Sequence, residues 1–233
     1  MIRVENLSAA YAGGIQAFKG ISFQAEAKEN LALVGANGAG KTSLLLALVG
    51  ILPFDSGEVV VDGLFMDPKN LDAFRRKVGL VFQNPEDQLF MPSIYEDLVF
   101  GPRNLGLSEE DARRRAEDAL ALLGISRLHD RSPLKMSGGE KRLAAIATVL
   151  TMRPLVMLFD EPTAYLDPRA RRSLITALKP LPHTKIIATH DLAFATEVCG
   201  RALVLKEGIL CAQGNPRDLF ADTALMEECG LAP

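Results

Sequence analysis

Short apolar segments recur along this chain, each bounded by glycine, proline or charged residues, and they predict strands. The five apolar residues 155–159 follow Arg153 and Pro154, which end the preceding helix, and they fit a strand buried on both faces of a parallel sheet. Further parallel strands are predicted at residues 31–34, 78–82, 186–189 and 201–206. An antiparallel β region is predicted near the N-terminus, at residues 2–11, 21–27 and 58–62.

Helical patterns alternate with these strands. Between residues 108 and 123 apolar side chains recur on one face, and Ser108 with Asp111 forms a capping box in front of them. Other helical patterns lie at residues 43–49, 140–152 and 215–229. We therefore expect an α/β fold with a mainly parallel core sheet, organised as one domain over residues 1–233 with a mostly helical insertion at residues 84–139.

A glycine-rich loop separates the first predicted parallel strand from the helix that follows it. Glycines in such a loop leave backbone N–H groups free to wrap a polyphosphate. Lys41 can reach the β and γ phosphates, and the Thr42 hydroxyl is placed to ligate Mg²⁺. We interpret the segment as a phosphate loop (P-loop), the alternative being a glycine-rich turn with an incidental lysine. The predicted nucleotide-binding residues are Gly35, Ala36, Asn37, Gly38, Ala39, Gly40, Lys41, Thr42 and Ser43.

Two carboxylates follow the apolar strand at residues 155–159. Asp160 stands at the carboxyl end of that strand, where it is well placed to hold Mg²⁺ through water. The adjacent Glu161 is a candidate general base for the water that attacks the γ phosphate. Acidic residues at a strand end are otherwise common solvated termini.

Ser137, Gly138 and Gly139 precede the helical pattern at residues 140–152. They place a hydroxyl and several free N–H groups at a helix N-terminus, which is a possible second anion-binding site. The alternative is an ordinary serine cap followed by flexible glycines.

In this order, the three motifs resemble those of the ATP-binding cassette (ABC) family, and the resemblance covers nearly the whole chain. It implies the P-loop NTPase fold of ABC ATPases and the hydrolysis of ATP with Mg²⁺. It also implies a dimer in which Ser137, Gly138 and Gly139 of one subunit meet the γ phosphate bound by the other. The segment around Ser137, Gly138 and Gly139 matches the signature motif of that family. Met136 stands where the signature motif usually opens with leucine, and Glu140 replaces the commoner glutamine.

The resemblance assigns roles to four further residues. Tyr11 fits the aromatic that stacks on adenine, although an edge-strand tyrosine is the alternative. Gln83 fits the glutamine that contacts Mg²⁺ and the attacking water, and His190 fits the histidine that hydrogen-bonds the γ phosphate. A lone histidine is otherwise usually structural. Asp167 matches the loop that crosses the dimer interface, in which Tyr165 occupies a place where a small residue is usual.

The branch of the family is indicated by residues 82–90, Phe-Gln-Asn-Pro-Glu-Asp-Gln-Leu-Phe, which resemble the energy-coupling-factor importers. That group takes up cobalt and nickel ions and several vitamins. An exposed segment carrying Gln88, Leu89 and Phe90 soon after Gln83 would offer transmembrane subunits an apolar anchor. The alternative is that Leu89 and Phe90 fill the core of the helical region.

Composition narrows the remaining choices. A net charge of −3 argues against a dedicated nucleic-acid surface, and three cysteines without metal spacing suit a reducing cytoplasm. The longest apolar run, residues 44–54, is too short to span a bilayer, so we expect attachment to the cytoplasmic face of the membrane through partner subunits. The alternatives are an ATPase for another ABC importer or exporter, and a soluble ABC ATPase acting on nucleic acid. The transported solute, and whether the dimer pairs two copies or a sister ATPase, are not encoded here.

Overall fold

The computed structural model describes residues 1–231, which divide into two compact units. The first unit holds residues 1–80, 155–161 and those from 182 onward, and the second holds residues 81–154 and 162–181. The helical unit is therefore larger than the predicted insertion at residues 84–139, because it also takes in the whole of the helix after Ser137 and the next helix along the chain.

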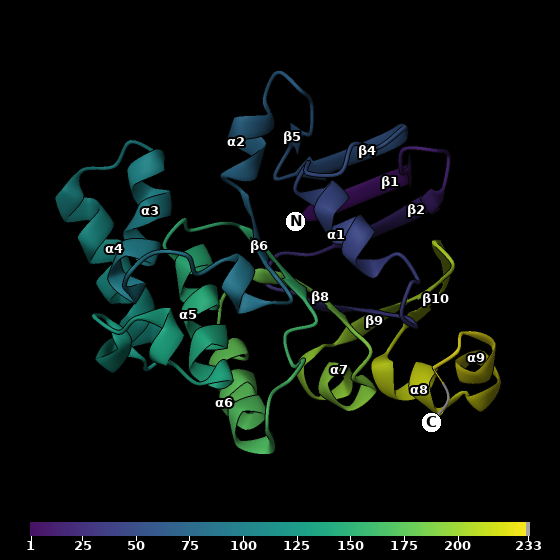
Figure 1. The fold of residues 1–233 in the computed structure, drawn as a ribbon. Coiled ribbons are helices and arrows are strands. Elements are labelled where there is room, and N and C mark those ends of the chain that lie inside the picture. The colour runs from purple at the N-terminus through teal and green to yellow at the C-terminus, as the bar shows by residue number, and fades with distance from the viewer. Residues whose placement is uncertain (232–233) are drawn as a thin grey trace. The chain divides into compact units, whose positions relative to one another are not determined.

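The first unit contains two sheets (Figure 1). The four-stranded sheet has the order β2-β1-β4-β5 and is antiparallel throughout. Its strands are β1 (Ile2–Ala10), β2 (Gln16–Ala25), β4 (Ser56–Val61) and β5 (Leu64–Phe65). The predicted antiparallel region is confirmed, but β2 begins five residues before the predicted residue 21. The register of β1 and β2 shifts between Leu7 and Ala9, and Gly20 takes a φ of 62°, so the local alternation is interrupted inside a continuous strand.

The six-stranded sheet has the order β10-β9-β3-β8-β7-β6. Strand β3 pairs in parallel with both β8 and β9, β7 pairs in parallel with β8, and β10 closes one edge in antiparallel fashion. The strands are β3 (Asn30–Val34), β6 (Val78–Val81), β7 (Val156–Asp160), β8 (Thr184–Thr189), β9 (Arg201–Lys206) and β10 (Ile209–Gly214). The mainly parallel core sheet is thus confirmed.

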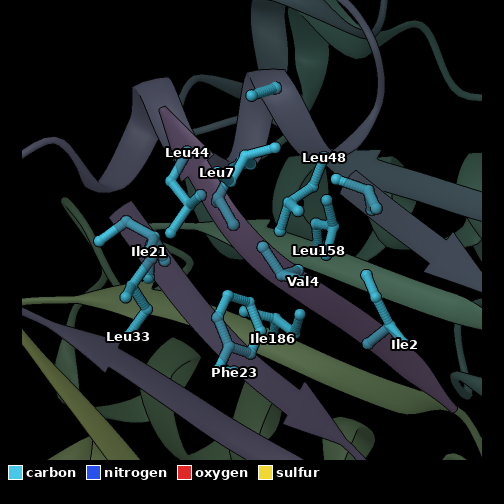
Figure 2. Close-up of a cluster of buried hydrophobic side chains, with 14 of the residues drawn as sticks. Ile2, Val4, Leu7, Ile21, Phe23, Leu33, Leu44, Leu48, Leu158 and Ile186 are labelled. Carbon is cyan, nitrogen blue, oxygen red and sulfur yellow. The ribbon is translucent and has the colours of Figure 1, made fainter. Parts of the chain in front are cut away.

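The core of the first unit lies around helix α1 (Lys41–Leu48), between side chains of both sheets. Figure 2 shows Leu44 and Leu48 of α1 pointing toward Val4 of β1 and toward Leu158 and Ile186 of the parallel strands. All five side chains are buried. Burial of apolar area contributes roughly 25 cal/mol per Å², so this cluster stabilises the first unit and fixes α1, and with it the end of the loop that precedes α1.

Four shorter helices complete the first unit. They are α2 (Leu71–Arg75), α7 (Leu192–Val198), α8 (Pro216–Ala221) and α9 (Thr223–Glu228). The tail at residues 215–229 is helical, as predicted, and consists of two short helices. Asp222 has an extended conformation, with ψ 93°, which ends α8, and its carboxylate accepts a hydrogen bond of 3.0 Å from the N–H of Leu225, which starts α9.

The second unit is helical, with α3 (Ile94–Asn104), α4 (Glu109–Leu122), α5 (Gly138–Leu150) and α6 (Pro168–Leu178). Each helix begins at a side-chain cap: Ser93, Ser108, Ser137 and Asp167 accept hydrogen bonds from backbone N–H groups of the first turn. Helices α5 and α6 approach closely at Gly139, where an added Cβ would lie 2.7 Å from the Cβ of Ala170.

Candidate functional site

The P-loop connects β3 to α1, as predicted. Glycine is needed at its positions for two different reasons, backbone conformation and close packing. Gly40 takes a φ of 98°, and Gly38 takes a φ of 83°. Residues other than glycine rarely adopt this left-handed backbone conformation. Gly35 is required by packing, because a Cβ there would lie 2.4 Å from the carbonyl oxygen of Leu205 in β9. The loop is therefore shaped by its backbone and by contact with the neighbouring strand.

Lys41 is folded back into this loop. Its side chain is buried, and Nζ donates to the carbonyl oxygens of Gly35 at 2.7 Å and Ala36 at 3.1 Å. The same ammonium lies 3.6 Å from Oε1 of Glu161. A buried ammonium held by two carbonyls and a carboxylate is positioned to exchange those partners for the oxygens of an anion in the loop.

Thr42, in the first turn of α1, contacts Asp160 at the end of β7. The Thr42 hydroxyl donates a hydrogen bond of 2.8 Å to Oδ2 of Asp160, which is itself buried at the end of β7. Hydroxyl and carboxylate oxygens are the ligands that Mg²⁺ prefers, usually together with phosphate oxygens and water. The donor set fits such an ion. Within residues 1–231, no cluster of three or more His, Cys, Asp or Glu side chains is arranged to hold a metal.

Glu161 lies between two basic side chains. Its Oε1 faces Lys41, and its Oε2 is 3.0 Å from Nδ1 of His190 and accepts a hydrogen bond of 3.3 Å from the backbone N–H of His190. Glu161 is buried and takes a φ of 42°, while its N–H donates to the carbonyl of Ala188 at 2.9 Å. Such backbone strain is tolerated where the surroundings fix the residue, and it is concentrated at functional sites.

Tyr11 follows β1 and lies beside the start of α1. Its hydroxyl is 2.7 Å from Oγ of Ser43, and 43% of the residue is exposed. The structure therefore brings Tyr11 together with the P-loop helix while leaving much of its ring accessible. Stacking on adenine stays a prediction.

The other predicted residues, Gln83, Ser137, Gly138, Gly139 and Asp167, belong to the helical unit. Ser137 forms a capping box: its hydroxyl accepts from the N–H of Glu140 at 3.3 Å, and the Glu140 carboxylate accepts from the N–H of Ser137 at 3.1 Å. The hydrogen bond from the Ser137 N–H is the main cause that holds the pKa of Glu140 below its usual value. The ordinary-cap alternative is therefore present in the structure, and a role in binding a second nucleotide stays a prediction.

Two of the three residues in the predicted exposed anchor are not exposed. Leu89 is buried, and Gln88 turns inward to donate hydrogen bonds of 2.7 Å to the carbonyl of Ala145 and to Oγ1 of Thr148 in α5. Phe90 alone is exposed, at 61%, and packs edge to face on Phe100 with ring centroids 5.2 Å apart. The expectation was wrong for both residues, because Gln88 satisfies its amide by hydrogen bonds to α5 and Leu89 lies in the hydrophobic interior.

Sequence reasoning missed Arg142. This residue lies on α5, is 1% exposed, and donates to the backbone carbonyls of Phe82 and Gln83. The available signal was a charged residue in a helix whose other buried positions, such as Ala145 and Ile146, are apolar.

Comparison with known proteins agrees with the geometry. The ABC transporter family model matches residues 18–164. The energy-coupling factor transporter ATP-binding protein EcfA of Methanothermobacter thermautotrophicus is 42% identical over 99% of this chain and 76% of its own length.

Solved structures extend this likeness. The structure of cbiO1 from Clostridium perfringens, described as part of the ABC transporter complex cbiONQ, has a TM-score of 0.87 at 38% identity and covers 99% of this chain and 94% of its own. A dimeric ATP-binding cassette in a post-hydrolysis state, bound to ADP and Pi, has a TM-score of 0.81 at 27% identity and covers 93% and 99% of the two chains.

Proposed function

This chain belongs to the ABC transporter family, a family of ATPases, and from that premise we propose that it is the ATP-hydrolysing subunit of a membrane importer of the energy-coupling-factor type. The observation that carries the ATPase assignment is the convergence of Lys41, Glu161 and His190 beside the P-loop, next to the Thr42–Asp160 pair. An ammonium, a candidate base and two hard oxygen ligands are what the hydrolysis of a nucleoside triphosphate requires.

On ATP binding, phosphate oxygens replace the carbonyls of Gly35 and Ala36 as partners of the Lys41 ammonium. The loop N–H groups and the positive end of α1 then hold the remaining charge. Thr42 and Asp160 are the residues that would hold Mg²⁺, which supplies neutralisation of the phosphate charge when it is bound with ATP. Gln83, which belongs to the helical unit, stays a predicted Mg²⁺ ligand on the family resemblance alone.

Glu161 then acts as the general base. With Lys41 engaged by phosphate, its carboxylate keeps the contact with His190 and can accept the proton of the attacking water. His190, whose side chain is 60% exposed, is free to turn its other ring nitrogen toward the γ phosphate.

The importer branch rests on residues 82–90 and on two similarities. The relative EcfA is named an energy-coupling factor protein, and the neighbour cbiO1 is described as part of the complex cbiONQ. We assign the solute to the class of cobalt or nickel ions or a vitamin. It would be bound by other subunits, because the site of this chain is built for phosphate.

Partner subunits would supply attachment to the cytoplasmic face of the membrane. Among residues 1–231 no helix has the length and apolar character needed to cross a bilayer. Phe90 and Phe100 form an exposed aromatic pair on the helical unit and are our candidates for the anchor on transmembrane subunits. Asp97 holds this anchor in place, because its Oδ1 accepts hydrogen bonds of 3.1 Å from the N–H groups of both Phe90 and Met91.

The test is co-purification of the tagged full-length chain from gently solubilised membranes of its own cell, with every partner identified by mass spectrometry. We expect a transmembrane scaffold and a small membrane-embedded solute-binding subunit. Phe90→Ser with Phe100→Ser should lose both partners. The matched control is Phe65→Ser, which removes a phenylalanine of similar exposure, 49%, from β5 in the other unit.

Recovery of soluble or nucleic-acid-bound partners without any membrane protein would overturn the importer and leave the ATPase in place. Equal recovery of the membrane partners with the double variant would show that the anchor lies elsewhere.

A further inference from the structure

A buried arginine holds the backbone that carries Gln83. Arg142 lies on α5, five residues after the cap Ser137, and only 1% of it is exposed. Its Nη1 donates to the carbonyl of Phe82 at 2.7 Å, and its Nη2 donates to the carbonyl of Gln83 at 2.6 Å. The planar guanidinium thus binds two consecutive peptide carbonyls, and a guanidinium is costly to bury unless such bonds are made.

Gln88 links the same segment to the same helix through separate hydrogen bonds. Its Oε1 accepts a hydrogen bond of 3.2 Å from the N–H of Phe82, and its Nε2 donates to Ala145 and Thr148. Arg142, Ala145 and Thr148 are spaced by three residues and therefore lie along one side of α5. Phe82 is consequently held at both its N–H and its carbonyl.

The side chain of Gln83 is left out of these contacts. Gln83 is exposed, whereas its backbone is anchored by Arg142. A side chain that takes part in a reaction must be held in one orientation, since small misplacements of a reacting group lower the rate. A fixed backbone below the accessible side chain of Gln83 provides this.

We propose that Arg142 is a positioning residue for Gln83, which makes residues 82–88 and the Ser137-capped helix α5 move as one piece. The proposal rests on the proposed role of Gln83 in ATP hydrolysis. Through Arg142 and Gln88, any displacement of Gln83 by bound nucleotide is passed directly to the helix whose N-terminus carries Ser137, Gly138 and Gly139.

The kinetic test is a double-mutant cycle in the full-length chain. Arg142→Lys keeps the charge but cannot bind both carbonyls in a plane, so we expect kcat for ATP hydrolysis to fall about tenfold with KM for ATP unchanged. In a Gln83→Ala background the same substitution should cause no further loss, because the residue it positions is absent.

The matched control is Arg115→Lys. Nη1 of Arg115 donates to the carbonyl of Thr151 at 3.2 Å, so it is also an arginine bound to a backbone carbonyl in the helical unit, at the far end of α5. We expect its kcat to equal that of the wild type. A second variant, Gln88→Met, removes the hydrogen bonds of Gln88 without touching the buried charge, and it should lower kcat in the same way. It serves as the test if Arg142→Lys folds poorly.

A structural readout accompanies the kinetics. Amide hydrogen exchange without nucleotide should speed up over residues 81–91 in Arg142→Lys and in Gln88→Met, while α4 exchanges as in the wild type. Unchanged exchange over residues 81–91 would overturn the proposal that Arg142 and Gln88 hold this segment in place. An equal loss of kcat with and without Gln83 would overturn positioning, because Arg142 would then support the fold alone.

If Gln83→Ala by itself leaves kcat unchanged, Gln83 has no role for Arg142 to position and the proposal fails. The ATPase assignment would survive that result, since it depends on Lys41 and Glu161.

Discussion

At the scale of single residues, the site is preorganised by contacts that also restrain it. Glu161 adopts a φ of 42° and is held between Lys41 and His190. The strained backbone aims the carboxylate from the end of β7, while the buried lysine compensates its charge. The candidate base is thus both positioned and neutralised by its neighbours.

Glu161→Gln removes the basic carboxylate and keeps the shape of the side chain. We expect turnover to fall at least about 100-fold with ATP affinity retained, because the phosphates are bound by the loop and Lys41 and not by Glu161. Phosphate release and equilibrium binding of ATP measure the two effects. Lys41→Ala is the contrasting variant and should lose binding itself; rapid hydrolysis by Glu161→Gln would sink the assignment of the base.

Lys185 shows a titratable group outside the site. It lies on β8, is 1% exposed, and Nζ donates to the carbonyl of His183 at 3.1 Å. Burial lowers the pKa of Lys185 to about 8 from its ordinary value of 10.5, and burial also raises the pKa of the nearby Cys199 thiol to about 12.

Because the pKa of Lys185 is lower in the folded state, the unfolded chain binds more protons than the folded chain between pH 8 and 10.5. The free-energy cost of burying the charged ammonium is therefore lost as pH rises through that window. The unfolding free energy of the wild type relative to Lys185→Met should therefore increase from pH 8 to 10.5, by about 3 kcal/mol at most. Denaturant titrations in a Cys199→Ala background measure this without the thiol. A flat difference would contradict the burial of a charged lysine.

At the scale of elements, α5 is the centre of the helical unit. It packs on α6 through Gly139, receives Gln88 along one side and carries Arg142 toward the segment after β6. Its N-terminus is closed by the capping box of Ser137 and Glu140. The signature glycines therefore have unequal roles even before nucleotide is considered: Gly139 is required by packing, whereas a Cβ at Gly138 would meet open space.

Gly139→Ala should lower the unfolding free energy by about 1–3 kcal/mol, because its Cβ would lie 2.7 Å from that of Ala170 and the two helices must separate. Gly138→Ala is the matched control and should stabilise slightly, since alanine favours the helix and no neighbour lies within 4 Å. Thermal unfolding without nucleotide compares the two variants. Equal melting temperatures would mean that the close approach of α5 and α6 is unimportant.

At the scale of the whole molecule, the predicted nucleotide contacts are divided between the two units. Lys41, Thr42 and Glu161 belong to the first unit, and Ser137 belongs to the second. The family resemblance assigns Ser137 to the nucleotide of another subunit. Under this assignment one chain would supply half of each of two sites, and we expect stable pairing to require both ATP and slow hydrolysis.

The Glu161→Gln chain should accordingly double its mass in light scattering when Mg²⁺ and ATP are added, and remain monomeric with ADP. The physical reason is that unhydrolysed γ phosphate supplies the charge that the N-terminus of α5 binds. Lys41→Ala in the Glu161→Gln background should stay monomeric with ATP. A chain that remains monomeric at high ATP would favour a sister ATPase as its partner.

The chain by itself determined the parts of this protein that depend on local chemistry. The apolar runs defined β3, β7, β8 and β9 to within two residues, and the spacing of Gly35, Gly38, Gly40 and Lys41 identified the P-loop. Such features are readable because strand burial and phosphate binding are written in neighbouring residues.

Tertiary structure decided how those residues are held. Three such contacts join positions far apart in the chain: Lys41 pairs with Glu161, Gln88 turns inward to Thr148, and Arg142 donates to the carbonyl of Gln83. Gln88 and Thr148 are 60 residues apart, and Lys41 and Glu161 are farther apart still. No local pattern encodes such pairs, because a buried polar side chain chooses its partner only after packing has excluded water from it.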